Sequence, residues 1–383
     1  MVFAVIEEYL DRSDKKITWT KLEREAGLTL GTISHSMNDG TEMNFVPLFN
    51  LAKIAATVAK DNYINLFSDL CLKFKRPKNI KCALEFLSIH RKLDHLEKLI
   101  SIIRTEHSSR ELKDWAEVYN IILMFQRDRK DLRYIQYLRD YSPKYLETKV
   151  LATILEIYRL YEEQEYKSML SNVKTIEVSL SSIKDDYIQA SFSNRVNQIL
   201  AHTYLYRYAD VKTARQYIEK IIYNKYSAIL ASDSYYLMGM TFFFEDCDKC
   251  LTYLEKYIDL LEKTGREKFA TLIKKNDIPF VQAHWGRKQS LEEDVSLSER
   301  AHYESKWGDK KKALEMIDEA ITNEGISPFK LYYKALATDD TSLFLESLIL
   351  FSKKGNKFFA SLPYEHLKNH PMLGNAAKLL YEN

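Results

Sequence analysis

Apolar residues recur every three or four positions along most of the chain, with polar residues between them. One such series consists of Leu84, Leu87, Leu93, Leu96, Leu99 and Ile103. This spacing gathers apolar side chains on one face of an α-helix. Short breaks that contain proline or glycine interrupt the pattern, for example at Ser142-Pro143 and at residues 325–328. The pattern predicts an all-α protein in which these breaks separate helices rather than domains.

Small residues recur at fixed intervals in the second half of the chain. Ala313 follows Ala301 by twelve positions, and Ala335 follows Ala301 by thirty-four. Ala214 and Gly239 mark two further copies of the same pattern. Thirty-four residues is the period of the tetratricopeptide repeat, a helix pair in which a small residue lies where the two helices meet. The recurrence predicts a tetratricopeptide-like right-handed superhelix.

Stacked helix pairs of this kind form an extended concave surface, which mostly binds peptides or protein segments. On the inner helices, the residues expected to line this surface include Thr203, Tyr206, Arg207, Met240, Phe243 and His302. The alternative for each of them, with equal weight, is ordinary packing within the superhelix. The second half of the chain is therefore predicted to be a binding module.

Residues 18–40 carry the pattern of a helix-turn-helix. One amphipathic helix ends at Ala26-Gly27, and a second begins after a short turn. The start of the second helix is rich in small polar side chains, which have the right length to reach base edges and phosphates in a major groove. The predicted DNA-binding residues are Lys21, Thr29, Gly31, Thr32, Ser34, His35 and Ser36. The alternative is a plain helical hairpin.

The charge of the N-terminal segment bears on DNA binding. Residues 1–60 contain seven Lys/Arg and eight Asp/Glu, and the whole chain has a formal net charge of +2. Because affinity for DNA comes largely from neutralising phosphates, this balance is poor for a monomer. Two modules presented by a dimer would compensate, so a homodimer is part of the prediction.

The composition excludes several other classes of protein. With 10 glycines and 7 prolines among 383 residues, the chain has too few turn-formers for an all-β sandwich or barrel. Four cysteines are too few for a disulfide framework, which favours a reducing, cytoplasmic compartment. No apolar run is long enough for a membrane span, and the N-terminal residues lack the basic leader of a signal peptide. We therefore expect no membrane association.

The sequence carries no motif for catalysis or a cofactor. Cys247 and Cys250 have the spacing of half a zinc site, but a structural zinc ion needs four ligands and no second pair stands nearby. Phosphate loops, nucleophile elbows and catalytic triads are not recognisable. We expect no metal, no cofactor and no enzymatic activity.

A helix-turn-helix joined to a tetratricopeptide superhelix is the plan of the peptide-pheromone receptors of Gram-positive bacteria. Within that group, the chain resembles the arbitrium receptor family of Bacillus phages and prophages. The resemblance spans nearly the whole length and is clearest at residues 71–87, 204–222 and 333–359. The last stretch is the most specific, because its Thr-Asp-Asp and Glu-Ser-Leu elements and its basic-aromatic end match in order and spacing.

The resemblance implies a homodimeric transcription regulator that controls the choice between lysis and lysogeny. In the family, the free receptor binds operator DNA, and a secreted hexapeptide that typically ends in Arg-Gly-Ala weakens this binding. Glu299 stands where the family offers a carboxylate to the peptide arginine. Thr203 replaces an asparagine of relatives and Asn356 stands near a family aspartate, which is consistent with a different peptide.

The sequence and the resemblance together give a set of predicted sites. The predicted peptide-binding residues are Thr203, Tyr206, Arg207, Tyr236, Met240, Phe243, Glu299, His302, Asn356 and Phe359. Leu373, Leu379 and Leu380 are predicted to contribute to the dimer contact. The predicted domains are a helix-turn-helix at residues 1–66, a helical connecting region of degenerate repeats at 67–145, and a peptide-binding and dimerisation domain at 146–383. Two alternatives stay open: another peptide-regulated transcription factor, and a helical-repeat adaptor without DNA binding.

Overall fold

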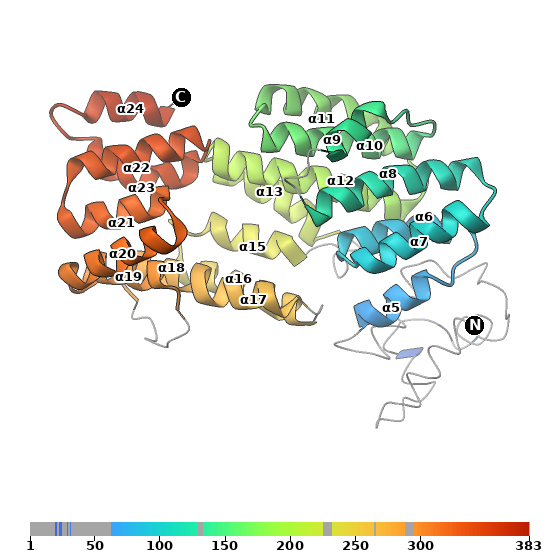
Figure 1. Ribbon diagram of the computed structural model, residues 1–383, viewed down its shortest axis with the longest axis horizontal. Coiled ribbons are helices and arrows are strands. Elements are labelled where there is room, and N and C mark those ends of the chain that lie inside the picture. Colours follow the sequence, from blue (N-terminus) through green and yellow to red (C-terminus); the bar gives the residue numbers. More distant parts are fainter. Residues whose placement is uncertain are drawn as a thin grey trace. The chain divides into compact units, whose positions relative to one another are not determined.

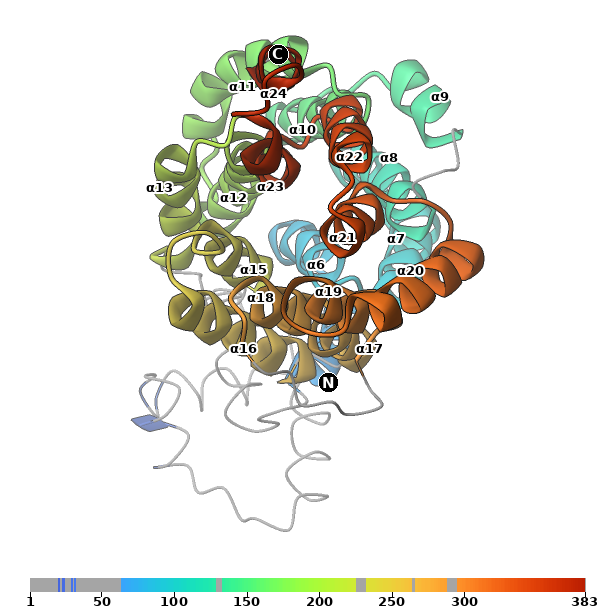
Figure 2. The ribbon, with the colours of Figure 1, turned by 90° about the vertical axis from the view of Figure 1, so that its left-hand side faces the viewer.

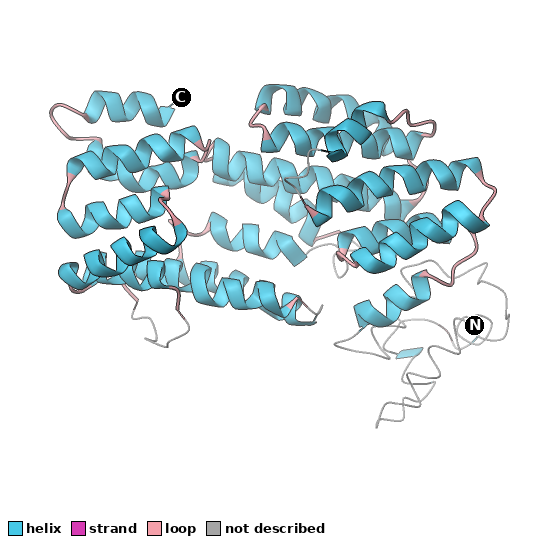
Figure 3. Cartoon of the chain, viewed as in Figure 1, coloured by secondary structure: helices cyan, strands magenta, loops and turns pink. Residues whose placement is uncertain are grey.

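The computed structural model describes residues 63–128, 133–224, 232–263, 266–287 and 295–382, with single positions at Thr20, Glu23, Arg24, Thr29 and Gly31. All regular structure in these ranges is helical, so the predicted fold class, all-α, is confirmed there (Figures 1 and 3). None of the helices in the described ranges is long and apolar enough to cross a membrane.

The first group of helices consists of α5 (Tyr63–Cys71), α6 (Pro77–Ile89), α7 (Leu93–Glu106), α8 (Arg110–Arg127), α9 (Arg133–Asp140), α10 (Leu146–Glu162), α11 (Tyr166–Ser181) and α12 (Asp186–His202). The second group consists of the π-helical turn η2 (Thr203–Arg207), α13 (Val211–Ile222), α15 (Ser232–Thr241), α16 (Cys247–Lys263), α17 (Glu267–Leu272), the π-helical turn η3 (Ile273–Asp277), α18 (Ile278–His284), α19 (Leu297–Trp307), α20 (Lys310–Glu324), α21 (Pro328–Thr338), α22 (Thr341–Lys353), α23 (Lys357–Leu367) and α24 (Gly374–Glu382).

The predicted breaks separate helices, as expected. The Ser142-Pro143 break lies between α9 and α10, and residues 325–327 lie between α20 and α21. At the second break Gly325 has a φ of 81°, a left-handed conformation that costs glycine little. The side chain of Ser327 then caps α21 by accepting a hydrogen bond from the Lys330 amide at 3.2 Å.

The chain divides into two compact units. Unit 1 comprises Met1–Val196, Asn224–Tyr226 and Lys263–Gly265, and unit 2 comprises Asn197–Tyr223, Ser227–Glu262 and Arg266–Asn383. The domain boundaries expected from the sequence, at 66/67 and 145/146, stay predictions.

A buried ion pair ties α6 to α12 within unit 1. The Arg195 guanidinium donates hydrogen bonds to both carboxylate oxygens of Glu85 at 2.9 Å, and the Tyr119 hydroxyl donates a third at 2.7 Å. Burial alone would raise the pKa of Glu85, but the attraction of Arg195 and these hydrogen bonds lower it overall. Glu85 is therefore held as a fully buried, ionised partner, an arrangement that stabilises only while both charges are present.

Unit 2 is a succession of packed helices. Helices α18 to α24 each contact the next, and α23 also contacts η2 near the beginning of the unit (Figure 2). Ala301 on α19, Ala313 on α20 and Ala335 on α21 are fully buried. A Cβ on Gly239 of α15 would lie only 3.1 Å from the Cys250 carbonyl oxygen of α16. The small residues therefore lie where helices approach closely, as predicted.

The π-helical turn η3 is followed directly by a helix with a proline in its first turn. Pro279 stands in the first turn of α18 and has no N–H, so it cannot donate to the carbonyl of Lys275. That carbonyl instead accepts a hydrogen bond from the backbone N–H of Ser296 at 3.0 Å, immediately before α19. This bond ties the end of η3 to the start of α19, and both segments contribute side chains to the site described next.

Candidate functional site

A cavity of 310 Å³ opens within unit 2. Its lining comes from α15, η3, α18, α19, α21 and α23 and from the turn before α21. The lining residues are Tyr236, Met240, Asn276, Asp277, Phe280, Ser298, Glu299, Ser327, Phe329, Lys330, Tyr333 and Phe359. Aromatic faces and two carboxyl groups thus share one enclosed space.

Glu299 is held in the first turn of α19. The Tyr333 hydroxyl of α21 donates to its two carboxyl oxygens at 3.1 and 3.2 Å. Burial raises the pKa of Glu299 to about 8, and the Tyr333 hydrogen bond offsets only part of that increase. The carboxyl is therefore mostly protonated at neutral pH in the ligand-free protein.

His302, one turn further along α19, packs against Tyr333 and lies close to Glu299. Its ring is fully buried and stacks on Tyr333 with centroids 4.2 Å apart and planes 10° from parallel. Burial lowers its pKa well below the usual value, so the imidazole is neutral. Its Nδ1 lies 3.4 Å from a Glu299 carboxyl oxygen, which makes this contact one between two neutral groups rather than an ion pair.

Asp277 is the second carboxyl group of the cavity and lies at the end of η3. The Tyr236 hydroxyl of α15 donates a hydrogen bond to it at 2.8 Å. Burial raises the pKa of Asp277, the Tyr236 hydrogen bond lowers it, and the proximity of Glu299 adds a smaller increase, so that the resulting pKa is about 6. Asp277 is therefore mostly ionised at neutral pH.

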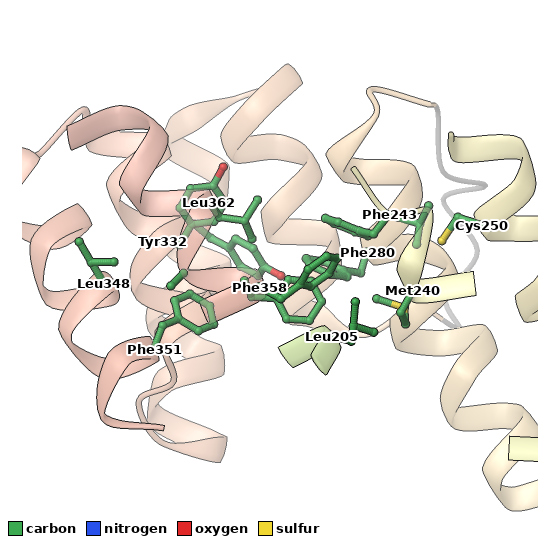
Figure 4. Close-up of a cluster of buried hydrophobic side chains, with 14 of the residues drawn as sticks. Leu205, Met240, Phe243, Cys250, Phe280, Tyr332, Leu348, Phe351, Phe358 and Leu362 are labelled. Carbon is green, nitrogen blue, oxygen red and sulfur yellow. The ribbon is translucent and has the colours of Figure 1, made fainter. Parts of the chain in front are cut away.

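Aromatic rings form the wall of the cavity. The ring centroid of Phe329 lies 5.3 Å from that of Phe280 and 5.2 Å from that of Phe359. Figure 4 shows Phe280 and Met240 gathered with the neighbouring core residues Phe243 and Phe358. At the start of α23, the side chain of Asn356 accepts a hydrogen bond from the Phe359 amide at 3.1 Å, which fixes the helix that carries Phe359.

The predicted peptide-binding residues fall into two groups. Tyr236, Met240, Glu299 and Phe359 line the cavity. Thr203, Phe243 and His302 are buried outside its lining, Tyr206 packs on Phe358 and Phe359, Asn356 caps α23, and Arg207 ends η2. The binding role of both groups stays a prediction.

Sequence reasoning missed several residues of the lining. Asp277 and Tyr333 supply the second carboxyl group and the hydroxyl that binds Glu299, and Phe280 and Phe329 supply two of the aromatic rings of the wall. Tyr333 lies thirty-four residues after Glu299, which equals the repeat period, so equivalent positions in successive repeats were a usable signal. Asp277 had no such signal because η3 interrupts the regular helical spacing.

The other predicted sites lie elsewhere. Lys21, Thr32, Ser34, His35 and Ser36 lie outside the described residues, and Thr29 and Gly31 are described only as single positions, so the helix-turn-helix stays a prediction. Leu373 and Leu380 pack partly buried against the core of unit 2, whereas Leu379 on α24 is 63% exposed.

Cys247 and Cys250 pack in the hydrophobic core of unit 2. Burial raises the pKa of both thiols, which disfavours the thiolate that a metal or a redox partner would need. Within the described ranges, no group of three or more His, Cys, Asp or Glu side chains is arranged to hold a metal ion.

Comparisons with known proteins agree with this fold. Residues 63–369 match the family described as "AimR transcriptional regulator-like". The AimR transcriptional regulator of Bacillus phage phi3T is 24% identical over 333 residues, which cover 84% of this chain and 85% of that protein. An uncharacterized protein of Bacillus anthracis is 27% identical over 238 residues, covering 58% of this chain and 85% of that protein.

Two solved structures share the architecture. "Structure of SeMet-phAimR" covers 100% of both chains with a TM-score of 0.80 and 20% identity. "Structure of phAimR-Ligand" covers 85% of this chain and 98% of its own, with a TM-score of 0.68 and 21% identity. The fold and the extent of the family match define the class as AimR-like transcriptional regulators. This chain belongs to the AimR transcriptional regulator-like family, and the predicted resemblance is confirmed.

Proposed function

We propose that this protein is a peptide-responsive transcription regulator and that its cavity receives a positively charged side chain of a secreted hexapeptide. The observation that carries the proposal is Glu299, a mostly buried carboxyl group fixed by Tyr333 inside an aromatic cavity. An arginine guanidinium binds a carboxylate through paired hydrogen bonds and stacks on aromatic faces, so it satisfies both features of this wall.

The size of the cavity supports a side-chain pocket. Its 310 Å³ lies at the small end of the roughly 300–1,000 Å³ range of ligand pockets, which suits one long side chain better than six residues. In this proposal the arginine of a peptide that ends in Arg-Gly-Ala enters the cavity. The rest of the peptide lies along the concave face of a tetratricopeptide-like superhelix.

The regulatory step follows from linkage. The peptide-free protein binds operator DNA as a homodimer through its N-terminal helix-turn-helix, and the bound peptide weakens that contact, which shifts the choice between lysis and lysogeny. By thermodynamic reciprocity, operator DNA weakens peptide binding by the same factor. The proposal contains no catalytic step, metal or cofactor, and places the protein in the cytoplasm of a bacterial host.

Thermal unfolding against a collection of hexapeptides with three variable residues followed by Arg-Gly-Ala tests this function. A peptide at a hundredfold its dissociation constant adds about 2.7 kcal/mol, which raises the midpoint by several degrees. We expect one or a few members to raise it, and their arginine-to-alanine versions to have no effect. If no member of the collection moves the midpoint, the proposed ligand class is wrong.

A further inference from the structure

We infer that Asp277 is a specificity-determining residue that, together with Glu299, selects a guanidinium over an ammonium group in the cavity. The inference rests on the proposed function and assigns a role to a residue that neither the sequence analysis nor the proposal so far uses. In this arrangement the two carboxyl groups approach the same guanidinium, each taking part of its fork of N–H donors.

Asp277 is placed for such a contact. It lines the cavity, and its carboxylate accepts a hydrogen bond from the Tyr236 hydroxyl at 2.8 Å, which occupies only part of the accepting capacity of that group. Within the described ranges, no lysine, arginine or histidine forms an ion pair with Asp277. A partly buried carboxylate without a paired cation is destabilised by its incomplete hydration, and a ligand cation would reduce that cost.

The two carboxyl groups act on one site. Asp277 and Glu299 line the same cavity, and the proximity of Glu299 contributes to the raised pKa of Asp277. Their backbones are also tied together, because the Lys275 carbonyl of η3 accepts a hydrogen bond from the Ser296 N–H just before α19. The pair is therefore held in a fixed relation before any ligand arrives, which favours specific recognition.

A separate polar atom in the cavity also indicates a ligand. The hydroxyl oxygen of Ser298, on the first turn of α19, is buried and has no hydrogen-bond partner among the described residues. Buried hydroxyl groups are normally satisfied. Ser298 thus offers an acceptor beside the two carboxyl groups, where a third N–H of a guanidinium would be satisfied.

Two lysines near Asp277 and Glu299 pair with other residues, so neither neutralises these carboxyl groups. Lys330 lines the cavity, but its ammonium donates to the carbonyls of Ala320 and Gly325 and pairs with Glu324 at 2.8 Å. On η3, the Lys274 ammonium pairs with Glu262 at 2.6 Å. His302 is neutral because of its burial.

Geometry explains why the pair would prefer arginine. A guanidinium presents five N–H donors in a planar fork and can meet carboxyl groups on two edges at once. An ammonium is a compact charge with three donors and a stronger attachment to water. Two carboxyl groups and an aromatic wall therefore favour the guanidinium, and removal of one carboxyl group reduces the preference.

The test compares peptides that carry Arg-Gly-Ala with matched peptides that carry Lys-Gly-Ala. Each is titrated by calorimetry against the native protein, Asp277→Asn and a control variant, Asp233→Asn. Asparagine keeps the size of Asp277 and an oxygen that accepts from Tyr236. Asp233 accepts a similar hydrogen bond from a tyrosine, Tyr257 at 3.3 Å, but does not line the cavity.

We expect the native protein and Asp233→Asn to bind the arginine peptide more tightly than the lysine peptide, and Asp277→Asn to lose roughly tenfold or more of that preference, the usual effect of a charged hydrogen bond. If arginine peptides bind and Asp277→Asn keeps the native preference, this inference is overturned while the proposed function stands. If no peptide binds the native protein, the proposed function fails, and this inference fails with it.

Discussion

At the scale of single residues, the site depends on what burial does to ionisable groups. Glu299 and Asp277 are acids in an apolar, aromatic cavity, so both hold their protons more tightly than usual. The two differ in degree, since the pKa of Glu299 rises to about 8 and that of Asp277 to about 6. Near neutral pH the empty cavity therefore holds one protonated and one ionised carboxyl group.

The raised pKa of Glu299 makes the stability of the ligand-free protein depend on pH. The unfolded chain releases this proton near the usual value of 4.5 and the folded protein only near 8, so stability falls as pH rises between these values. The loss is at most about 1.4 kcal/mol per pH unit. Glu299→Gln keeps an oxygen that accepts from Tyr333, but its amide does not titrate in this pH range.

Urea unfolding of the native protein and of Glu299→Gln at pH 6, 7 and 8 measures how the free energy of unfolding of each protein depends on pH. We expect the native protein to lose more free energy of unfolding over this range than Glu299→Gln, because Asp277 and the other titrating groups are common to both. Parallel pH profiles of the two proteins would contradict the assigned protonation state.

Some of these residues were accessible from the sequence and others were not. Glu299 emerged from the family resemblance and Met240 from its place on a predicted inner helix, whereas Tyr236 and Phe359 came from the sequence and the resemblance together. Asp277 escaped because its position depends on the π-helical turn η3. Pro279 cannot donate a hydrogen bond to the Lys275 carbonyl of that turn, and Ser296, from a separate segment, donates one instead. A partner so far along the chain has no local signal.

At the scale of the helices, small residues set the packing. Ala301 and Ala313 are fully buried, and Gly239 lies where α15 approaches α16 closely; their spacing in the sequence indicated helices packed against one another. The helix α24 illustrates the limit of such reasoning. It carries Leu379 and Leu380 side by side in the sequence, but Leu380 packs against the core of unit 2 while Leu379 is 63% exposed.

This difference gives a matched pair of variants for the proposed homodimer. Leu379→Asp should weaken self-association and leave the unfolding midpoint nearly unchanged, because in the proposed dimer this exposed residue of α24 faces the partner rather than the core. Leu380→Asp should instead cost about 1–3 kcal/mol of stability, since it places a charge against apolar neighbours. Sedimentation equilibrium and thermal unfolding separate the two effects, and unchanged self-association of Leu379→Asp would remove α24 from the proposed dimer contact.

At the scale of the whole molecule, the fold class could be predicted from the sequence, but the internal division could not. Helical periodicity, few turn-formers and the repeat interval led to an all-α chain, and the resemblance led to the family. The two compact units divide near Val196, within α12, where helical periodicity continues without a break. Periodicity reports local structure, whereas a division into units depends on which helices share a core.

The central claim is that the cavity of unit 2 regulates DNA binding, and one measurement tests it most directly. Fluorescence anisotropy of DNA segments from beside the gene is recorded with the native protein and with Glu299→Gln, in the presence and absence of an Arg-Gly-Ala hexapeptide that stabilises the native protein. We predict that the peptide reduces DNA binding by the native protein and leaves that of Glu299→Gln unchanged. An equal reduction for both proteins, or no effect on the native protein, would contradict the account.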